Sequence, residues 1–156
     1  MKVVAIAAVA DNGVIGSGQE MLWHISEDFR RFKTVTMGHT LVFGRRTFEQ
    51  IGKLSGRRHI ICTRDRQWSA EGVDVATSPR EAVEMAREAG EEICFIAGGG
   101  QIYADAFELC GELDITEVHQ SPNGAVRFPA LDPAVWVETR REPRGGFDFV
   151  GYRRRA

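Results

Sequence analysis

The chain has 156 residues, of which 43% are hydrophobic and 27% are charged, a composition typical of globular proteins. This length predicts a single domain, which we expect to span residues 1–156. The 20 basic and 22 acidic residues give a net charge of −2. A near-neutral chain lacks the overall positive field that attracts nucleic acid or anionic lipid. Any affinity for phosphate must therefore come from the local placement of arginines.

Cysteine usage and the amino terminus indicate a cytoplasmic protein without a structural metal. The three cysteines, Cys62, Cys94 and Cys110, show neither CxxC nor Cys/His spacing. This argues against a disulfide framework or a zinc site. The apolar run over residues 3–10 is shorter than a signal peptide of roughly 15–30 residues. It is also shorter than a membrane helix of roughly 20 residues, so we expect a buried strand.

The elements predicted in chain order alternate between strands and helices. After the strand over residues 3–10, Asp11-Asn12-Gly13 opens a glycine-containing loop that continues to Trp23. Ser26 is the expected N-cap of a helix that runs to about Met37 and ends at Gly38. The remaining elements are strands over 40–43, 59–63, 73–76, 93–97, 113–119, 135–141 and 147–154, and helices over 45–51, from the capping box 78–81 to Gly90, and from Gly98 to about Cys110.

This alternation predicts a doubly wound α/β fold. We expect a mainly parallel central sheet with helices on both faces. The two closing strands follow each other without a helix between them, joined by a turn at Gly145-Gly146. They therefore predict an antiparallel edge at the carboxyl-terminal end of the chain.

Three predicted strand ends carry groups suited to phosphate. Gly44-Arg45-Arg46-Thr47 opens a helix, Arg64 follows the strand over residues 59–63, and Gly98-Gly99-Gly100 opens another helix. Helix N-termini bind anions, and glycines let backbone approach a pyrophosphate closely. The pattern is not GxGxxG, and no acidic residue is evident for a ribose 2′-hydroxyl. Arg64 instead suits a 2′-phosphate, which favours NADPH over NADH.

Asp28 is the candidate carboxylate of the first helix. Asp28 and Phe32 are four residues apart and Phe29 lies between them on nearly the same stripe, so Asp28 faces the apolar side. Two interpretations stay open. The carboxylate could merely complement the helix dipole. Beside two phenylalanines and Trp23 it would instead be desolvated, with a raised pKa, as expected of a group that binds a polar heterocycle.

Taken in order, these residues resemble the dihydrofolate reductase family from end to end. The blocks that carry the resemblance are Ile6-Ala7-Ala8, Gly13-Val14-Ile15-Gly16, Met21-Leu22-Trp23, Asp28-Phe29-Arg30-Arg31-Phe32-Lys33, Gly44-Arg45-Arg46-Thr47, Gly56-Arg57-Arg58, Gly98-Gly99-Gly100-Gln101-Ile102-Tyr103, Thr116-Glu117 and Phe128-Pro129. Each block alone is modest evidence, whereas the ordered set is highly specific.

The resemblance implies NADPH-dependent reduction of 7,8-dihydrofolate to tetrahydrofolate, with hydride transfer to pterin C6 and protonation at N5. It implies four catalytic residues: Asp28 and Thr116 holding the pterin, Trp23 holding a water, and Tyr103 beside the nicotinamide. Further substrate contacts would come from Ile6, Ala7, Phe32 and Arg57, with Arg57 binding the glutamate α-carboxylate. The residues implied to bind the cofactor are Ala8, Ile15, Gly16, Gly44, Arg45, Arg46, Thr47, Thr63, Arg64, Gly98, Gly99, Gly100, Gln101 and Ile102.

Some positions depart from the family pattern. Leu22 stands where proline is usual, Ala97 where a larger aliphatic residue is usual, and Ala125 where many bacterial members have aspartate. Phe48 replaces a common tryptophan. These departures bear on loop closure and on the pocket wall more than on the reaction.

Two other functions are alternatives to this one. One is a pyrimidine reductase of riboflavin synthesis, which resembles this fold and uses NADPH but must bind a ribityl phosphate; Asp28 and Arg57 favour folate instead. The other is a catalytically idle nucleotide-binding module. We expect a monomer that acts on a small molecule, with no nucleic-acid or membrane partner.

Overall fold

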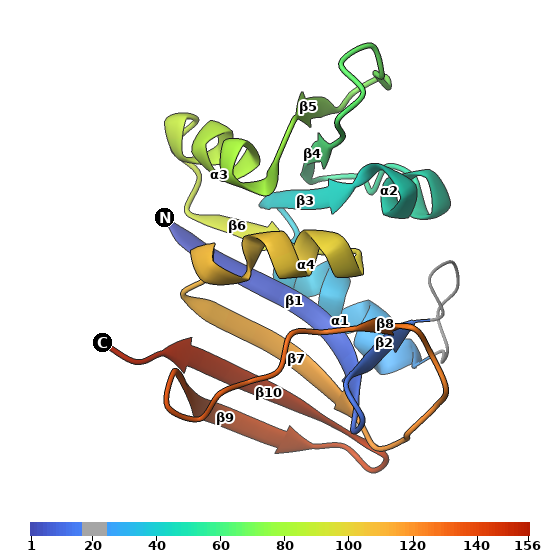
Figure 1. Ribbon diagram of the computed structural model, residues 1–156, viewed down its shortest axis with the longest axis vertical. Coiled ribbons are helices and arrows are strands. Elements are labelled where there is room, and N and C mark those ends of the chain that lie inside the picture. The colour runs from blue at the N-terminus through green and yellow to red at the C-terminus, as the bar shows by residue number, and fades with distance from the viewer. Residues whose placement is uncertain (17–24) are drawn as a thin grey trace.

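The computed structural model describes residues 1–16 and 25–156. Strands and helices alternate along the chain (Figure 1). The elements are β1 (Lys2–Ala10), β2 (Val14–Gly16), α1 (Ser26–Thr36), β3 (Thr40–Gly44), α2 (Arg45–Ile51), β4 (Arg58–Cys62), β5 (Asp74–Ala76), α3 (Pro79–Glu88), β6 (Ile93–Ile96), α4 (Gly100–Ala106), a 3₁₀ turn (Phe107–Leu109), β7 (Glu112–Val118), β8 (Val126–Arg127), β9 (Trp136–Pro143) and β10 (Phe147–Arg154).

The central sheet has eight strands in the order β5-β4-β3-β6-β1-β7-β10-β9. The strands from β5 to β7 pair in parallel, whereas β10 pairs antiparallel with both β7 and β9. This confirms the predicted parallel sheet with an antiparallel carboxyl-terminal edge. The register of β1 and β7 pairs Ala8 with Thr116, so these two residues lie side by side where both strands approach their carboxyl ends.

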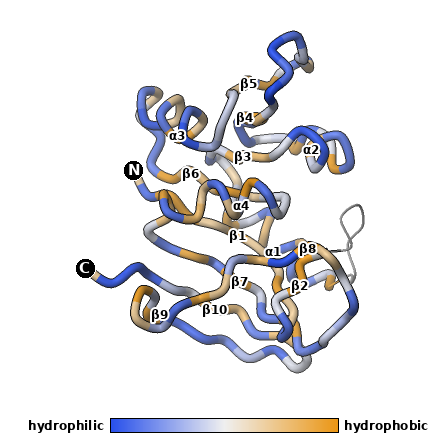
Figure 2. Tube along the Cα trace, in the orientation of Figure 1, coloured by the Kyte–Doolittle hydropathy of each residue, from blue (hydrophilic) through white to orange (hydrophobic). Residues whose placement is uncertain are grey.

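Helices cover both faces of the sheet, and the side chains of β1 alternate between them (Figure 1). Val3 and Ala5 belong to the core cluster under α3 and α4, while Val4 and Ile6 belong to the cluster that packs with α1 and α2. The hydrophobic stretch along β1 is visible at the centre of the molecule in Figure 2. Burying an aliphatic side chain of this kind stabilises the fold by roughly 1.5–3 kcal/mol, so each face of the central strand is anchored.

Of the two N-caps predicted from sequence, the one at α3 is confirmed and the one at α1 is wrong. Ser78 caps α3 as predicted, because its hydroxyl accepts a hydrogen bond from the Glu81 N–H at 3.1 Å. Ser26, in contrast, is the first residue of α1 and not its N-cap. Ile25 occupies the cap position with an extended backbone (φ −120°, ψ 103°). The backbone turns into the helix one residue earlier than the preference of serine for N-caps indicates.

Two short strands lie in segments that the sequence predicts to be loops. β2 pairs antiparallel with β8, joining Val14 to Arg127 across more than a hundred residues. No local pattern predicts such a pair, because each strand forms its hydrogen bonds with a segment far away in the sequence. The helix that begins after the glycines is also shorter than expected, since Phe107–Leu109 tightens into a 3₁₀ turn. The predictions for residues 17–24 lie outside the described residues.

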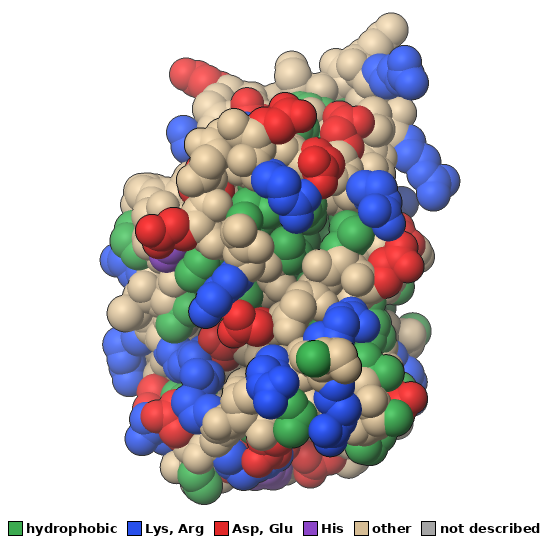
Figure 3. Space-filling view, turned by 90° about the vertical axis from the view of Figure 1, so that its left-hand side faces the viewer, with side chains coloured by type: hydrophobic (Ala, Val, Ile, Leu, Met, Phe, Trp, Pro, Cys, Tyr) green, Lys and Arg blue, Asp and Glu red, His purple; other side chains and the backbone are tan. Residues whose placement is uncertain are grey.

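Charged side chains of both signs are interspersed over the face shown in Figure 3. This distribution agrees with the small net charge of −2. Within residues 1–16 and 25–156, no helix combines the length and the apolar character needed to cross a membrane.

Candidate active site

A cavity of about 630 Å³ opens beyond the carboxyl ends of β1, β3, β6 and β7. This is the crevice in which open α/β sheets bind their ligands. Residues of α1 and α2 complete its walls. The sequence-predicted site residues that line it are Ile6, Ala7, Ala8, Ile15, Asp28, Phe32, Thr47, Arg57, Gly98, Gly99, Gly100, Tyr103 and Thr116.

Asp28 and Thr116 form the polar centre of this cavity. The first turn of α1 carries Asp28, and the Thr116 hydroxyl on β7 donates a hydrogen bond of 2.5 Å to its carboxylate. Burial is the largest influence on Asp28 and raises its pKa, while the Thr116 hydrogen bond acts in the opposite direction. Burial thus favours the protonated form of Asp28 more than in an exposed aspartate, and the ionised carboxylate can accept hydrogen bonds from an amidine-like ligand edge.

An ion pair lies beside Asp28 that the sequence did not reveal. The Arg31 guanidinium makes two hydrogen bonds to the Asp114 carboxylate, at 2.8 and 2.9 Å. Their side chains are only 18% and 12% exposed, and the guanidinium stacks on the Phe149 ring 4.8 Å from its centroid. The positive charge of Arg31 lowers the pKa of Asp28 and the negative charge of Asp114 raises it. The two charges therefore act on Asp28 in opposite directions.

The two phenylalanines near Asp28 differ in exposure. Phe32 is half-buried and packs against the core cluster beneath α1. Phe29 also lines the cavity but is 44% exposed. The apolar stripe predicted around Asp28 is therefore open on the Phe29 side.

Arg57 supplies a positive charge to the cavity. Its Nε donates to the Ser55 carbonyl oxygen at 3.1 Å and its Nη1 donates to the Thr36 hydroxyl at 3.3 Å. Desolvation by burial lowers the pKa of the Arg57 guanidinium. Neither partner is a carboxylate, so among residues 1–16 and 25–156 the charge of Arg57 is left for an anionic ligand.

Tyr103 and the glycine turn meet in the floor of the cavity. The Tyr103 hydroxyl donates a 2.6 Å hydrogen bond to the Ile6 carbonyl oxygen, and its burial raises the pKa of the phenol. Gly98 has φ +118°, a conformation that favours glycine, and an added Cβ there would lie 3.4 Å from the Tyr103 ring. The tyrosine thus supports the turn from below while its hydroxyl is held by the main chain of β1.

The other two glycines of the turn leave room that a side chain would fill. A Cβ on Gly99 would lie 2.9 Å from the Thr47 hydroxyl, and a Cβ on Gly100 would collide with Val126. Gly44 is tied to the same turn, because its N–H donates to the Gly98 carbonyl oxygen at 2.8 Å. The starts of α2 and α4 are therefore brought side by side, with main chain exposed between them, as a phosphate cradle requires.

The remaining predicted residues lie outside the cavity lining or outside the described chain. Arg45 is engaged by Glu49 at 3.2 Å and by Asp65 at 3.4 Å, and it stacks on Trp68. Trp23 falls in residues 17–24, outside the described part of the chain. The predicted residues of the described chain that do not line the cavity are Gly44, Arg45, Arg46, Thr63, Arg64, Gln101 and Ile102, and the prediction for Gly16 is not tested.

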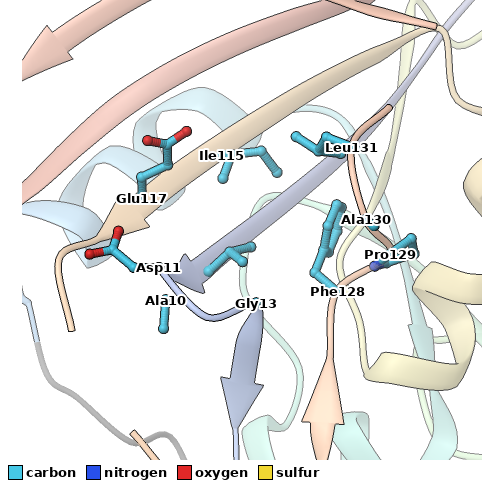
Figure 4. Close-up of a pocket in the computed structure, with 10 residues that line it drawn as sticks. Ala10, Asp11, Gly13, Ile115, Glu117, Phe128, Pro129, Ala130 and Leu131 are labelled. Carbon is cyan, nitrogen blue, oxygen red and sulfur yellow. The ribbon is translucent and has the colours of Figure 1, made fainter. Parts of the chain in front are cut away.

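A second cavity, of about 270 Å³, lies between the carboxyl ends of β1 and β7 and the segment that follows β8 (Figure 4). Its floor is apolar, and its acidic side chains are Asp11 and Glu117. The Glu117 carboxylate is already bonded by the Arg141 guanidinium at 2.9 Å and by the Tyr152 hydroxyl at 2.7 Å. None of its lining residues is a predicted site residue, so the larger cavity is the candidate active site.

Comparison with known proteins decides the family. A family model described as dihydrofolate reductase matches residues 2–151. The chain belongs to the dihydrofolate reductase family. The resemblance inferred from the ordered sequence blocks is thereby confirmed, and a reductase of riboflavin synthesis is not favoured.

Individual members of the family agree with this assignment. Dihydrofolate reductase HdrB of Haloferax volcanii is 38% identical over an alignment that covers 99% of this chain and 84% of that protein. Dihydrofolate reductase of Neisseria meningitidis serogroup A is 42% identical, covering 92% and 89%. A solved structure of dihydrofolate reductase from Enterococcus faecalis, complexed with NADP(H) and RAB-propyl, superposes with a TM-score of 0.91 at 32% identity, covering 99% and 97%.

Sequence reasoning missed several residues of this cavity. Arg31 lies three residues after Asp28, so helical spacing alone could have placed it near the carboxylate. Gln50 and Leu54 follow Thr47 on and after α2, outside the motifs on which the sequence predictions rest. Val126 enters through the unpredicted β8. Ala97, which departs from the family pattern, lines the wall as expected from its position before the glycines.

The ion pair beside Asp28 leads to a prediction of opposite sign for its two members. Asp114→Asn removes a negative charge and is expected to lower the pKa of Asp28, while Arg31→Met removes a positive charge and should raise it. The double variant should lie between the two. Titration of Asp28 followed by ¹³C NMR of its carboxyl carbon measures the midpoint in each protein.

The exposed pair Arg80–Glu108 gives a matched control. Its atoms lie 3.0 Å apart, but the side chains are 67% and 75% exposed. Solvent screens such a pair, so Arg80→Met should leave the Asp28 midpoint where it is. Shifts of the same sign in both single variants at the buried pair would show that packing, and not charge, governs the carboxylate.

Proposed function

We propose that this chain catalyses the NADPH-dependent reduction of 7,8-dihydrofolate to 5,6,7,8-tetrahydrofolate. The observation that carries the proposal is one cavity with a half-buried carboxylate, Asp28, and an arginine, Arg57, that pairs with no carboxylate of residues 1–16 and 25–156. Dihydrofolate has matching groups, with a polar pterin at one end and a glutamate carboxylate at the other. The membership of the chain in the dihydrofolate reductase family supports the same substrate.

Asp28 would hold the pterin by accepting hydrogen bonds from its 2-amino group and N3. Thr116 fixes the carboxylate by its 2.5 Å hydrogen bond, so the acceptor is preorganised before the ligand arrives. Burial raises the pKa of Asp28, so this group binds a proton beside the ring system more readily than an exposed aspartate does. A water would donate the proton to N5 itself, and Asp28 would act on the pterin through the hydrogen bonds that it accepts.

The described residues fit a nicotinamide dinucleotide. Main chain at Gly99 and Gly100 lies open at the start of α4, where an added Cβ would meet Thr47 or Val126. These residues, with Arg45, Arg46 and Arg64 along the strand ends, would hold the cofactor phosphates. When bound, NADPH supplies the hydride. Tyr103 and the Ile6 main chain would form the wall beside its nicotinamide.

Cofactor preference yields a prediction at Arg64. Within residues 1–16 and 25–156, no carboxylate forms an ion pair with this exposed side chain, so it can bind a 2′-phosphate. A hydrogen bond to a charged group contributes roughly 1.5–3 kcal/mol, so Arg64→Ala should reduce the NADPH-over-NADH preference in kcat/KM by about tenfold or more. Steady-state kinetics with both cofactors measure it.

Arg66→Ala is the matched control, because Arg66 is also exposed and lies two residues further along the same loop. Its removal should leave the preference unchanged at moderate salt. An equal loss in the two variants would assign the effect to the general positive field, and an unchanged preference in Arg64→Ala would place the 2′-phosphate elsewhere.

The direct test of the proposed function is an assay of the purified protein with NADPH and dihydrofolate. Loss of NADPH absorbance that depends on dihydrofolate supports the proposal. Oxidation that depends instead on a ribosylated aminopyrimidine would support the riboflavin-pathway reductase. Cofactor binding without turnover of either compound would support an idle nucleotide-binding module.

We further propose that the protein is a cytoplasmic monomer whose single domain spans residues 1–156. The three cysteines are free and buried, and burial raises the pKa of each thiol to about 12, which suits a reducing compartment. The described chain supplies both the Asp28 and the Arg57 region of one cavity. Light scattering after gel filtration tests the monomer directly.

A further inference from the structure

His59 is a buried histidine whose two ring nitrogens are both engaged by the main chain. It is 1% exposed at the start of β4. Its Nε2 accepts a hydrogen bond from the Leu54 N–H at 3.0 Å, and its Nδ1 lies 3.1 Å from the Arg57 carbonyl oxygen. The ring stacks on Phe43 and meets Phe48 edge-on, with centroids 6.2 and 6.0 Å away.

The two partners fix the protonation state of the ring. An amide N–H can only donate, so Nε2 must be an acceptor; a carbonyl oxygen can only accept, so Nδ1 must carry the proton. Only the neutral Nδ1–H tautomer satisfies both bonds. Desolvation by burial lowers the pKa of His59, and the charges of Arg57 and Lys53 lower it further against the opposing effect of the Arg57 carbonyl.

The main-chain groups held by His59 belong to residues that form the cavity. Leu54 and Arg57 both line it. The turn between them also provides the Ser55 carbonyl oxygen, which accepts from the Arg57 Nε at 3.1 Å. The imidazole thus bonds both ends of the turn that presents the Arg57 guanidinium.

We propose that His59 is a positioning residue, a neutral imidazole clamp that holds the main chain of Leu54 and Arg57 so that the guanidinium meets the carboxylate of the substrate. This inference rests on the proposed function, because the anion at Arg57 is the glutamate of dihydrofolate. His59 does not touch the cavity, so its effect is transmitted through the turn.

Protonation would break the clamp. An imidazolium carries a proton on Nε2, which would face the Leu54 N–H donor-to-donor. The groups that face the ring are Phe43 from β3, Phe48 from α2, and the turn with Lys53, Leu54 and Arg57. Because the folded pKa is lowered from its ordinary value of 6.5, the clamp is intact above that value and is lost as the pH falls through the folded pKa.

Three substitutions separate the two bonds. His59→Phe keeps a ring against Phe43 and Phe48 but removes both nitrogens. His59→Gln can place an amide oxygen near the position of Nε2 and retain the bond from Leu54. His59→Asn can place an amide N–H near the position of Nδ1 and retain the bond to the Arg57 carbonyl.

The expected result is a split between kinetic constants. Loss of both hydrogen bonds frees the turn, so the dihydrofolate KM of His59→Phe should rise about tenfold or more, with kcat and the NADPH KM unchanged. His59→Gln and His59→Asn should each recover part of the loss. The parent KM should rise at acid pH, and this rise should be absent from His59→Phe. Thermal melting confirms that each variant is folded at the assay temperature.

A double-variant cycle with Arg57 distinguishes positioning from general packing. In an Arg57→Leu background, His59→Phe should leave the dihydrofolate KM unchanged, because the side chain it positions is gone. His39→Gln is the matched control, since His39 is partly buried against Phe95 and outside the cavity lining. It should keep the parent KM.

The outcomes separate this inference from the proposed function. A parent protein that does not turn over dihydrofolate contradicts the proposed function. A parent that does, combined with an unchanged KM in His59→Phe, overturns the clamp. Equal losses in kcat and in both KM values, or a further loss in the Arg57→Leu background, also overturn it, because they show a general structural role.

Discussion

Replacing Asp28 with asparagine is expected to lower kcat at neutral pH by about 10²–10⁴-fold, the range that a positioned acid–base group contributes. Asparagine keeps the shape of the side chain and can still accept the Thr116 hydrogen bond, but it carries no charge and cannot bind a proton. NADPH affinity should survive, because the proposed cofactor residues lie elsewhere. Single-turnover absorbance measurements and NADPH titration together measure both effects.

Glu27→Gln tests whether Asp28 serves only the helix dipole. Both acids lie in the first turn of α1, but Glu27 is ion-paired with Arg144 at 3.2 Å and does not line the cavity. A dipole role predicts similar small losses of stability, roughly 0.3–1 kcal/mol, and no loss of rate in either variant. Near-parent turnover by Asp28→Asn would therefore remove Asp28 from the reaction.

Asp28→Asn, which is expected to lower kcat, should at the same time increase the stability of the fold. Burial raises the folded pKa of Asp28 above its ordinary value of 3.8, so the folded protein binds its proton more tightly than the unfolded chain. The stability that this proton contributes is present below pH 3.8 and is lost as the pH rises through the folded pKa. Above the folded pKa the ionised Asp28 thus destabilises the fold, and in that pH range Asp28→Asn should raise the free energy of unfolding measured in urea.

An element of the fold could be predicted from sequence wherever residues within a short segment determine its structure. The apolar run of β1 requires burial on both faces, and α2 has the bounds that were predicted between Gly44 and Gly52. Ser78 and Pro79 likewise set the start of α3 through a local hydrogen bond. The β2–β8 pair has no such local cause. Its two strands have three and two residues, and each depends on the other.

The residues of the candidate site also fall into those that local sequence signals predict and those that depend on distant parts of the chain. Asp28, Arg57 and the glycine turn could be proposed from residue type, spacing and family resemblance. The Arg31–Asp114 pair and the His59 clamp could not, because each depends on geometry that residue types do not reveal. Asp114 reaches Arg31 only because β7 lies next to β1 in the sheet, and the role of His59 depends on which way a turn directs one N–H and one carbonyl.

Arg57→Leu is expected to raise the dihydrofolate KM by about thirtyfold or more. Removing one member of a buried charge pair costs roughly 2–5 kcal/mol, and 2 kcal/mol corresponds to about that factor. Arg57 is partly desolvated, as the burial-lowered pKa of its guanidinium indicates, so its hydrogen bonds to a carboxylate are stronger than those of an arginine in water. Leucine retains an apolar stem against the cavity wall, so the loss reports the charge.

Arg58→Leu supplies the matched comparison at the next residue. Arg58 does not line the cavity, and its Nε donates to the Asp74 carboxylate at 2.8 Å on β5. Its removal should alter stability slightly and leave the dihydrofolate KM as in the parent.

A substrate analogue that lacks the glutamate tail sharpens the test of Arg57, because parent and Arg57→Leu should bind it equally. If Arg57→Leu binds dihydrofolate as tightly as the parent, the carboxylate of the substrate is held by another residue. Lys33 also lines the cavity and carries a positive charge, so it is then the next residue to substitute.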